Sequence, residues 1–147
     1  DGIRGTVNQH PMTAEIALKF GMAAGVYLKR KGDNNRVVVA KDTRLSGYLI
    51  EPALTAGLIS IGVDVTLVGP MPTPAVPMLI KSLRADFGIM ISASHNPYYD
   101  NGLKLFDRYG YKLGETCENK LQDLILGNEL DQYLAAPDKL GRANRLE

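Results

Sequence analysis

The sequence contains little that would serve disulfide formation, polyanion binding or membrane insertion. Cys117 is its one cysteine, which excludes an intrachain disulfide and favours a reducing, cytoplasmic location. The 17 basic and 16 acidic side chains are interspersed and give a formal net charge of +1, so neither nucleic acid nor a membrane surface is indicated as a partner. No apolar run approaches the ~20 residues that span a bilayer.

What is present is the composition of an ordinary globular domain. Apolar residues make up 45% and charged residues 22% of 147, a length typical of one domain. Apolar runs predict strands at 36–40, 63–68 and 85–91. Helical spacing predicts helices from 13 to about 31 and at 49–61, 74–84 and 115–126. Because strands alternate with helices, we expect a three-layer α/β/α domain with a mainly parallel sheet.

Single residues are expected to shape these helices. Thr13 is the predicted N-cap of the first helix, and Gly32 is its predicted stop. Gly21 and Gly25, one helical turn apart, are expected to allow close packing on the sheet. Pro52 is expected to kink or delay the second helix, because proline lacks a backbone donor.

The second half of the chain departs from simple alternation. Residues 103–106 and 109–113 predict a hairpin-like pair that adds an antiparallel edge to an otherwise parallel sheet. Residues 137–147 are polar and predict no complete element. We therefore interpret 1–136 as the domain and 137–147 as a linker toward a second domain, and we expect the sequence to be a fragment.

The strongest chemical signal follows the strand at 85–91. Residues 92–97 read Ser-Ala-Ser-His-Asn-Pro, residues 98–102 read Tyr-Tyr-Asp-Asn-Gly with its turn-forming Asn-Gly, and Lys104 follows two positions later. Ligands of open α/β sheets collect at the carboxyl ends of strands, where this loop is placed. Its serine could be an acyl nucleophile, a phosphate carrier or a turn residue. The Gly-x-Ser-x-Gly pattern of acyl nucleophiles is absent.

These strings resemble the active-serine loop of the phosphohexomutases, which move a phosphoryl group between two positions of a sugar. Asp-Gly-Ile-Arg-Gly at residues 1–5 resembles that family's N-terminal Gly-Thr-Asp-Gly-Ile-Arg-Gly, and residues 41–47 resemble the loop after its first long strand. Within the family, the serine loop is most similar to that of the phosphoglucosamine mutases. The resemblance covers essentially this whole chain but only the first quarter or third of an intact mutase.

The resemblance implies roles for three residues of the loop. Ser94 is the phosphorylated serine, which gives its phosphoryl group to the sugar and regains one from a bisphosphorylated intermediate. His95 would donate to the phosphate or orient the serine. Asn96 would border the phosphate and shape the turn. A phosphoserine carries roughly −1.5 to −2 charge, so positive groups or a metal must meet it.

Three basic residues are expected to meet that charge. By resemblance, Lys104 is a proton carrier or phosphoryl clamp, and an unperturbed lysine pKa of about 10.4 requires burial or neighbouring positive charge for the first role. Arg4 is expected to face the serine loop, since its guanidinium fork suits phosphate oxygens. Arg44 is expected to line the cleft as a phosphate ligand, while Asp42 and Ser46 cap and turn that loop.

The resemblance also implies a magnesium ion. The family binds Mg²⁺ through Asp-x-Asp-x-Asp-Arg, reads the sugar through a Glu-x-Ser-Gly-His-like loop and holds the distal phosphate with a further loop, and none of the three is in this sequence. Ser94, through its phosphate, is thus the one expected metal contact of this chain. A phosphorylated hexosamine, its bisphosphate and later domains of the parent chain are the expected partners. The chain alone is expected to be inactive.

Two alternatives remain open at this point. Another member of the same family, a phosphomannomutase or phosphoglucomutase, would share the loop, because sugar specificity depends on the missing segment. A non-catalytic α/β binding module with a regulatory phosphoserine is the alternative from another functional class. His10 and Cys117 have no partner at ligand spacing and are interpreted as structural.

Overall fold

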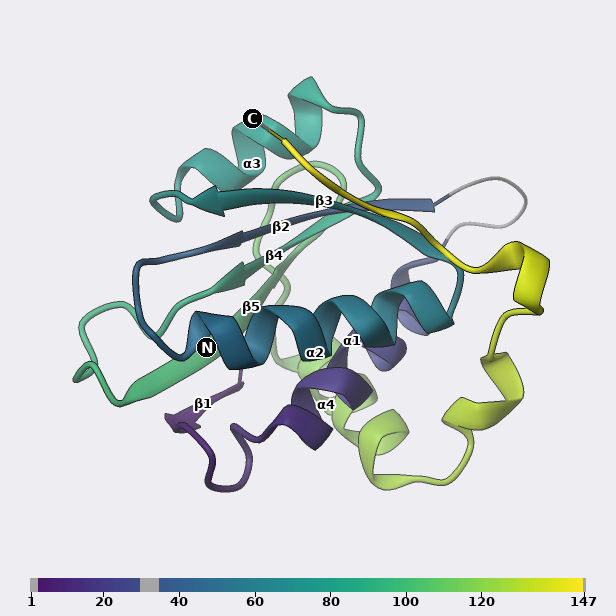
Figure 1. Cartoon of the computed structure of the whole chain (residues 1–147), viewed down its shortest axis with the longest axis horizontal. Coiled ribbons are helices and arrows are strands. Elements are labelled where there is room, and N and C mark those ends of the chain that lie inside the picture. Colours follow the sequence, from purple (N-terminus) through teal and green to yellow (C-terminus); the bar gives the residue numbers. More distant parts are fainter. Residues whose placement is uncertain (1–2, 30–34, 147) are drawn as a thin grey trace.

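The chain folds around one mixed β-sheet, most of whose strands are labelled in Figure 1. The computed structural model describes residues 3–29 and 35–146. Within them, six strands lie in the order β1-β5-β4-β2-β3-β6. The strands are β1 (Ile3–Thr6), β2 (Asn35–Lys41), β3 (Val63–Pro70), β4 (Phe87–Ile91), β5 (Asp100–Phe106) and β6 (Ala143–Arg145). The pairs β4–β2, β2–β3 and β3–β6 are parallel. β5 is antiparallel to both β4 and β1.

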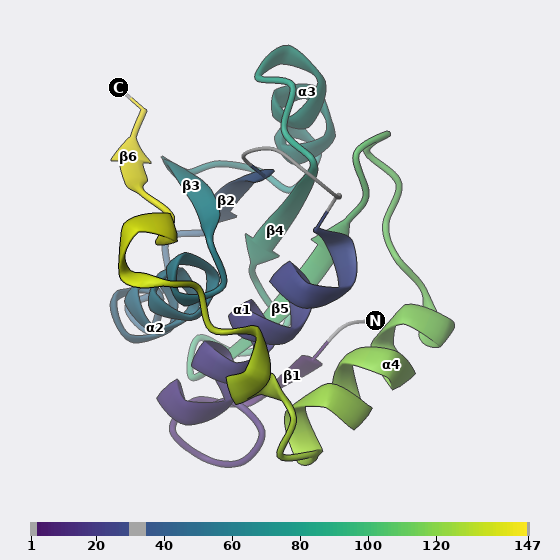
Figure 2. The same ribbon diagram turned by 90° about the vertical axis from the view of Figure 1, so that its right-hand side faces the viewer.

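Helices cover both faces of the sheet, as Figures 1 and 2 show from two directions. The helices are α1 (Ala14–Leu28), α2 (Gly47–Ser60), α3 (Ala75–Ser82) and α4 (Glu115–Leu126), with 3₁₀ turns at Leu130–Tyr133 and Pro137–Lys139. One core cluster joins α1, α2 and α4 to one face, and a second joins α3 to the other. Alternate residues of β2 serve the two clusters, because successive strand side chains point to opposite faces. The expected α/β/α class is confirmed.

The helices begin and end close to the expected positions. Thr13 caps α1, and its hydroxyl accepts from the Ile16 backbone N–H at 3.2 Å. The expected stop of α1 at Gly32 lies outside the described residues. Pro52 lies inside α2 but does not delay it, because the helix begins at Gly47. No helix in the described part of the chain is long and apolar enough to cross a membrane.

The expected edge hairpin at 103–113 is wrong in two respects. β5 is not an edge strand, because β1 pairs along its outer side with Ile3 opposite Leu103. The expected second arm contributes a single bridge, Phe106 to Lys112. The Asp107 carboxylate accepts from two backbone N–H groups of the turn, at Tyr109 and Tyr111, so the segment closes tightly and does not extend as a strand.

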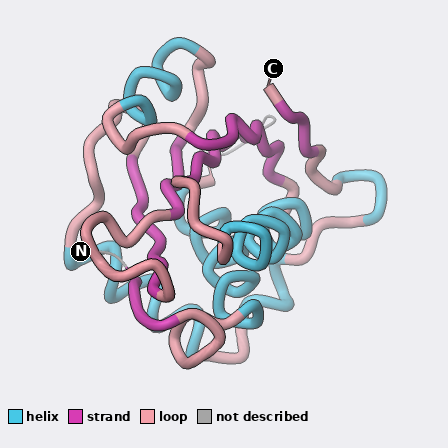
Figure 3. The backbone as a smooth tube through the Cα atoms, turned by 60° about the vertical axis from the view of Figure 1, so that its left-hand side comes forward, coloured by secondary structure: helices cyan, strands magenta, loops and turns pink. Residues whose placement is uncertain are grey.

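The expectation that residues 137–147 hold no complete element is also wrong. β6 pairs in parallel with β3, placing Ala143 opposite Val65 and Arg145 opposite Leu67. The Asp64 carboxylate accepts from the Arg142 backbone N–H at 2.9 Å and fixes the start of this pairing. Figure 3 shows the C-terminal strand running beside the sheet. These residues therefore belong to the fold, although all three of β6 are exposed.

Two glycines set the spacing between α1 and α2. A Cβ added at Gly57 would lie 2.0 Å from the Leu18 carbonyl oxygen, and one at Gly21 would lie 2.5 Å from that of Leu54. Gly21 therefore packs on a helix, not on the sheet as expected. Gly25 does face the start of a strand, because its added Cβ would lie 3.3 Å from a methyl of Val63. The two helices cross in near backbone contact.

Gly57→Ala should consequently destabilise the domain by about 1–3 kcal/mol, because the backbones must separate to admit one methyl group. Urea unfolding followed by circular dichroism measures the change. Gly114→Ala is the matched control, since nothing lies within 4 Å of its added Cβ. Equal stability of the two variants would show that α1 and α2 are not held at this spacing.

Candidate active site

Two loops meet where β2 and β4 end. Lys41 and Ile91, the last residues of these parallel strands, are register partners, so the segments that follow them begin side by side. The Asp42 backbone N–H donates to the Ile91 carbonyl at 3.1 Å and joins the two segments. This is the edge of an α/β sheet at which ligands bind. The loop position expected from the sequence is thus the one observed.

Ser94 is presented to solvent in an unusual backbone conformation. Its φ of +54° lies in the left-handed region, which is uncommon for residues other than glycine. The Ser94 backbone N–H donates to Ser92 Oγ at 3.0 Å, and the Asn96 N–H donates to the Ala93 carbonyl at 3.0 Å. Ser92 is buried whereas Ser94 is exposed. The loop therefore exposes the hydroxyl of Ser94, and the hydroxyl of Ser92 holds the Ser94 backbone in place.

Lys104 lies beneath that hydroxyl. It sits on β5 opposite Met90, and its Nζ donates to Ser94 Oγ at 2.7 Å. The residue is only 7% exposed. Burial, followed by the positive charges of Lys112, Arg4 and Arg44, lowers the pKa of Lys104, and Asp42 opposes this by raising it. A lysine with a lowered pKa in contact with a hydroxyl can exchange a proton with it more readily than an ordinary lysine can.

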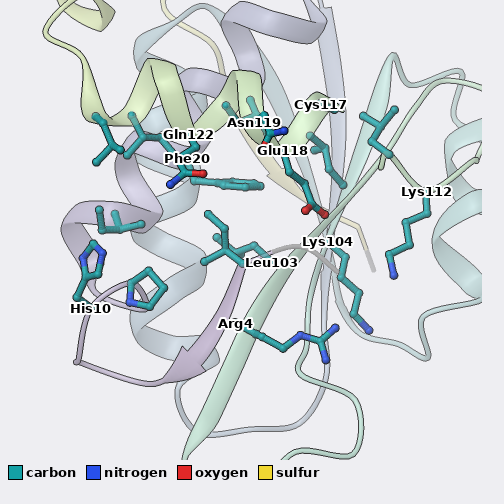
Figure 4. Close-up of a pocket in the computed structure, with 18 residues that line it drawn as sticks. Arg4, His10, Phe20, Leu103, Lys104, Lys112, Cys117, Glu118, Asn119 and Gln122 are labelled. Carbon is teal, nitrogen blue, oxygen red and sulfur yellow. The ribbon is translucent and has the colours of Figure 1, made fainter. Parts of the chain in front are cut away.

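Arg4 approaches the same ammonium from β1. It pairs with Gly102 across the sheet, two residues from Lys104 on β5. Figure 4 shows the Arg4 guanidinium and the Lys104 ammonium close together, with the Lys112 side chain directed toward them. Lys104 therefore lies between Ser94 and Arg4, and the expected action of all three on one phosphate stays a prediction.

A pocket of about 430 Å³ opens beside these cations, between α1, α4 and β5. Arg4, Lys104 and Lys112 line one part of it, and apolar side chains such as Phe20 and Leu121 line most of the rest. His10 lies at the opposite end in Figure 4. Ser94 does not line this pocket, so the pocket and the serine site are neighbours that share two basic residues.

Arg44 contacts the serine loop itself. Its Nη2 donates to the Ser94 carbonyl at 2.6 Å, and its Nη1 donates to the carbonyls of Pro97 at 3.2 Å and Asp100 at 3.0 Å. Its Nε lies 2.9 Å from the Asp42 carboxylate, which also accepts from the Arg44 backbone N–H. The turn role expected for Asp42 is confirmed. The phosphate role expected for Arg44 stays a prediction, because every contact shown for its side chain is to protein.

Asn96 and His95 complete the expected set. Asn96 Nδ2 donates to the Asp100 carboxylate at 3.1 Å, and Thr6 Oγ1 donates to the other oxygen of that carboxylate at 3.1 Å. Asn96 thus shapes the loop. His95 is exposed, and its side chain makes no hydrogen bond within residues 3–29 and 35–146. Its role toward a phosphate stays a prediction.

Asn101 and Gly102 belong to the site's framework, which the sequence did not reveal. Asn101 is fully buried; its Nδ2 donates to Ser46 Oγ at 2.8 Å, and its Oδ1 accepts from the Gly102 N–H at 2.8 Å. A Cβ added at Gly102 would lie 2.9 Å from the Ser92 carbonyl oxygen. The Asn-Gly pair was read as a turn, but it lies within β5 and lets the serine loop approach closely. A glycine inside a strand is the signal for such an approach.

A metal cage is not built from these residues alone. In the described part of the chain, no group of three or more His, Cys, Asp and Glu side chains could hold an ion. The two carboxylates nearest the loop are engaged, Asp42 by Arg44 and Asp100 by Thr6 and Asn96. The metal contact expected at Ser94, through its phosphate, stays a prediction.

Cys117 packs in the core, and burial, with a smaller effect of Glu118, raises the pKa of its thiol. This agrees with the structural interpretation. His10 lines the outer end of the pocket and is exposed.

Comparison with known proteins points in one direction. Residues 1–132 match the family model described as "Phosphoglucomutase/phosphomannomutase, alpha/beta/alpha domain I". The chain is 63% identical over its whole length to a phosphoglucosamine mutase of Granulibacter bethesdensis and 59% identical to one of Rhodospirillum rubrum. A phosphoglucomutase/phosphomannomutase family protein of Burkholderia thailandensis superposes on 99% of the chain with a TM-score of 0.82 at 30% identity. The chain spans 32% of each of these three proteins.

Lys104→Met should leave the unfolding midpoint unchanged or raise it by roughly 2–4 °C. The substitution removes a buried charge that lies among other cations and keeps an unbranched side chain of similar length. Differential scanning calorimetry measures the midpoint. Lys120→Met, at an exposed lysine of α4, is the control and should change nothing. A fall of several degrees in the Lys104 variant alone would show that the lysine is retained for stability.

Proposed function

The chain belongs to the phosphoglucomutase/phosphomannomutase family, and we propose that it is the active-serine domain of a phosphoglucosamine mutase. The parent would interconvert glucosamine 6-phosphate and glucosamine 1-phosphate through a phosphoserine and a bisphosphorylated sugar, in the cytoplasm, for cell-envelope precursors such as peptidoglycan. The contact between Lys104 Nζ and Ser94 Oγ carries the proposal. It places a lysine with a lowered pKa on the one exposed serine of the loop.

In the first transfer, a sugar hydroxyl attacks the phosphorus of phosphorylated Ser94. A bond forms between phosphorus and the sugar oxygen, the bond between phosphorus and Ser94 Oγ breaks, and the sugar hydroxyl releases its proton to solvent or to a base outside this chain. Lys104, as an ammonium, donates its proton to the departing Oγ, whose distance of 2.7 Å from Nζ suits direct transfer. The protein's main contribution is position and charge neutralisation, as is usual in phosphoryl transfer.

In the second transfer, the bisphosphorylated sugar presents its other phosphate. Ser94 Oγ attacks that phosphorus and neutral Lys104 accepts the serine proton. The bond between phosphorus and the sugar oxygen breaks, and that oxygen takes up a proton from solvent or from an acid outside this chain. Lys104 therefore ends the cycle protonated and Ser94 ends it phosphorylated, as both began.

The surroundings of Lys104 favour the needed protonation state in each step. When Ser94 is unmodified, burial and three nearby cations lower the lysine's pKa and favour the neutral base. A phosphate on Ser94 adds about two negative charges within contact distance, which raises that pKa and favours the ammonium. The acid is thus present when the serine must leave, and the base is more available when the serine must attack.

Arg4 and His95 are proposed to act on the phosphoryl group. Arg4 lies close enough to Lys104 for its charge to affect that pKa, and a guanidinium fork can bind two phosphate oxygens. His95 adjoins Ser94 and is open to solvent. The ion that neutralises the transferring group would be Mg²⁺, held by the Ser94 phosphate together with ligands from outside this chain.

The alternatives are not favoured. The 63% identity is to a phosphoglucosamine mutase, whereas the Burkholderia family protein is 30% identical. A regulatory phosphosite on a binding module gives no reason for a buried lysine to contact the serine.

Stable phosphate should be found on Ser94 of the full-length parent and not on Ser92. Ser94 is exposed and contacts Lys104, whereas Ser92 is 5% exposed and its oxygen accepts the Ser94 N–H. Intact mass and peptide mapping identify the site. Phosphate on Ser92, or full turnover by Ser94→Ala with Ser92→Ala as control, would refute the assignment.

Residues 1–147 alone should show no mutase activity, even with magnesium and the sugar bisphosphate. The chain spans 32% of its relatives, and the metal, sugar and distal-phosphate motifs of the family are not in it. A coupled assay of the chain beside the full-length parent tests this. Turnover by the chain at the parent's rate would contradict the proposal that later domains complete the site.

A further inference from the structure

Four of the five N–H groups of the Arg44 guanidinium are engaged within the protein. One N–H is directed at the Asp42 carboxylate and three at backbone carbonyls. The three carbonyls belong to Ser94, Pro97 and Asp100, which span the serine loop from its nucleophile to the first residue of β5. The Arg44 side chain is 12% exposed. One side chain therefore hydrogen-bonds to three backbone carbonyls of the loop.

The Asp42 carboxylate fixes this arginine at two points. One oxygen accepts from the Arg44 backbone N–H at 3.1 Å, and the other lies 2.9 Å from Nε. Asp42 is itself tied to the end of β4 through its backbone N–H and the Ile91 carbonyl. Through Asp42, the arginine is thus linked to the end of β4, where the serine loop begins. Arg44 therefore connects the later residues of the loop to its starting point.

Ser94 is bracketed by hydrogen bonds on both of its peptide groups. Its N–H donates to Ser92 Oγ, and its carbonyl accepts from Arg44 Nη2. The left-handed conformation of a serine costs about 1–2 kcal/mol, so it persists only where contacts hold it. In this conformation Oγ meets Lys104 Nζ.

We propose that Arg44, oriented by Asp42, is a positioning residue that holds Ser94 in its left-handed conformation and directs Oγ to Lys104. The inference rests on the proposed phosphoryl transfer and deepens it. Arg44 acts through three loop carbonyls and does not bind the transferring phosphate. Its planar fork is essential and its charge alone is insufficient, because a lysine ammonium cannot reach three carbonyls and a carboxylate in one plane.

Arg44→Lys and Arg44→Met in the full-length parent separate the two roles. If the fork positions Ser94, both variants should lower kcat about 10²-fold, with KM changed little, because small misplacement of a reacting group has effects of this size. Arg36→Lys is the matched control. Arg36 also donates to a backbone carbonyl, that of Leu83, but lies near the other end of β2.

Hydrogen exchange gives a readout that does not depend on turnover. The Asn96 and Asp100 amides close the loop by donating to Ala93 and Pro97. Both Arg44 variants should exchange these amides at least about tenfold faster, with the amides of β2 and β4 unaffected. Asp42→Asn should act in the same direction and more weakly, and it serves as the second variant if either Arg44 variant fails to fold.

Each result decides the question. The inference would be overturned if Arg44→Lys kept a near wild-type kcat while Arg44→Met lost kcat and raised KM. That result would assign Arg44 to the phosphate. Unchanged loop exchange in the folded variants would overturn it as well, and so would faster exchange with wild-type kcat. If the wild-type parent has no mutase activity, the proposed function fails, while the exchange experiment still shows whether Arg44 holds Ser94.

Discussion

The antiparallel pairing of β5 with β4 is the constraint on which the candidate site depends. It places Lys104 opposite Met90, one residue before β4 ends and the serine loop begins. The serine loop leaves the end of β4 and leads into β5, which carries Lys104. The loop therefore lies close to that lysine. Gly102 makes this geometry possible, because any side chain there would collide with the Ser92 carbonyl. The left-handed Ser94 then turns its hydroxyl inward onto Nζ.

A second consequence is the gathering of positive charge. The charges of Lys112, Arg4 and Arg44 all lower the pKa of Lys104, and Asp42 opposes them. Clustered charge around a buried, titratable side chain is typical of functional sites. In the proposed function the site is the complement of a phosphorylated serine, and these charges would adjust Lys104 to the two halves of the proposed reaction.

The sequence predicted the parallel strands β2, β3 and β4 and all four helices, because their apolar patterns are clear and a cap such as Thr13 is local. It did not predict β1 and β6, which have four and three residues and form only because neighbouring strands offer edges. The prediction of Ser94, Lys104 and Arg4 came from a family pattern, and the structure added the contact between Lys104 and Ser94. The phosphate role that the sequence indicates for Arg44 stays a prediction. Its contacts with three loop carbonyls depend on loop geometry, which sequence spacing does not contain.

The protonation of Lys104 is the most direct test of this account. NMR titration of ¹⁵Nζ-labelled lysines in the full-length parent, with Lys104 identified through Lys104→Arg, would be measured on unmodified and phosphorylated protein. The account predicts that the Lys104 midpoint lies below those of the exposed lysines when Ser94 is unmodified, and that it rises on phosphorylation. A Lys104 midpoint that coincides with the exposed lysines in both forms would contradict it.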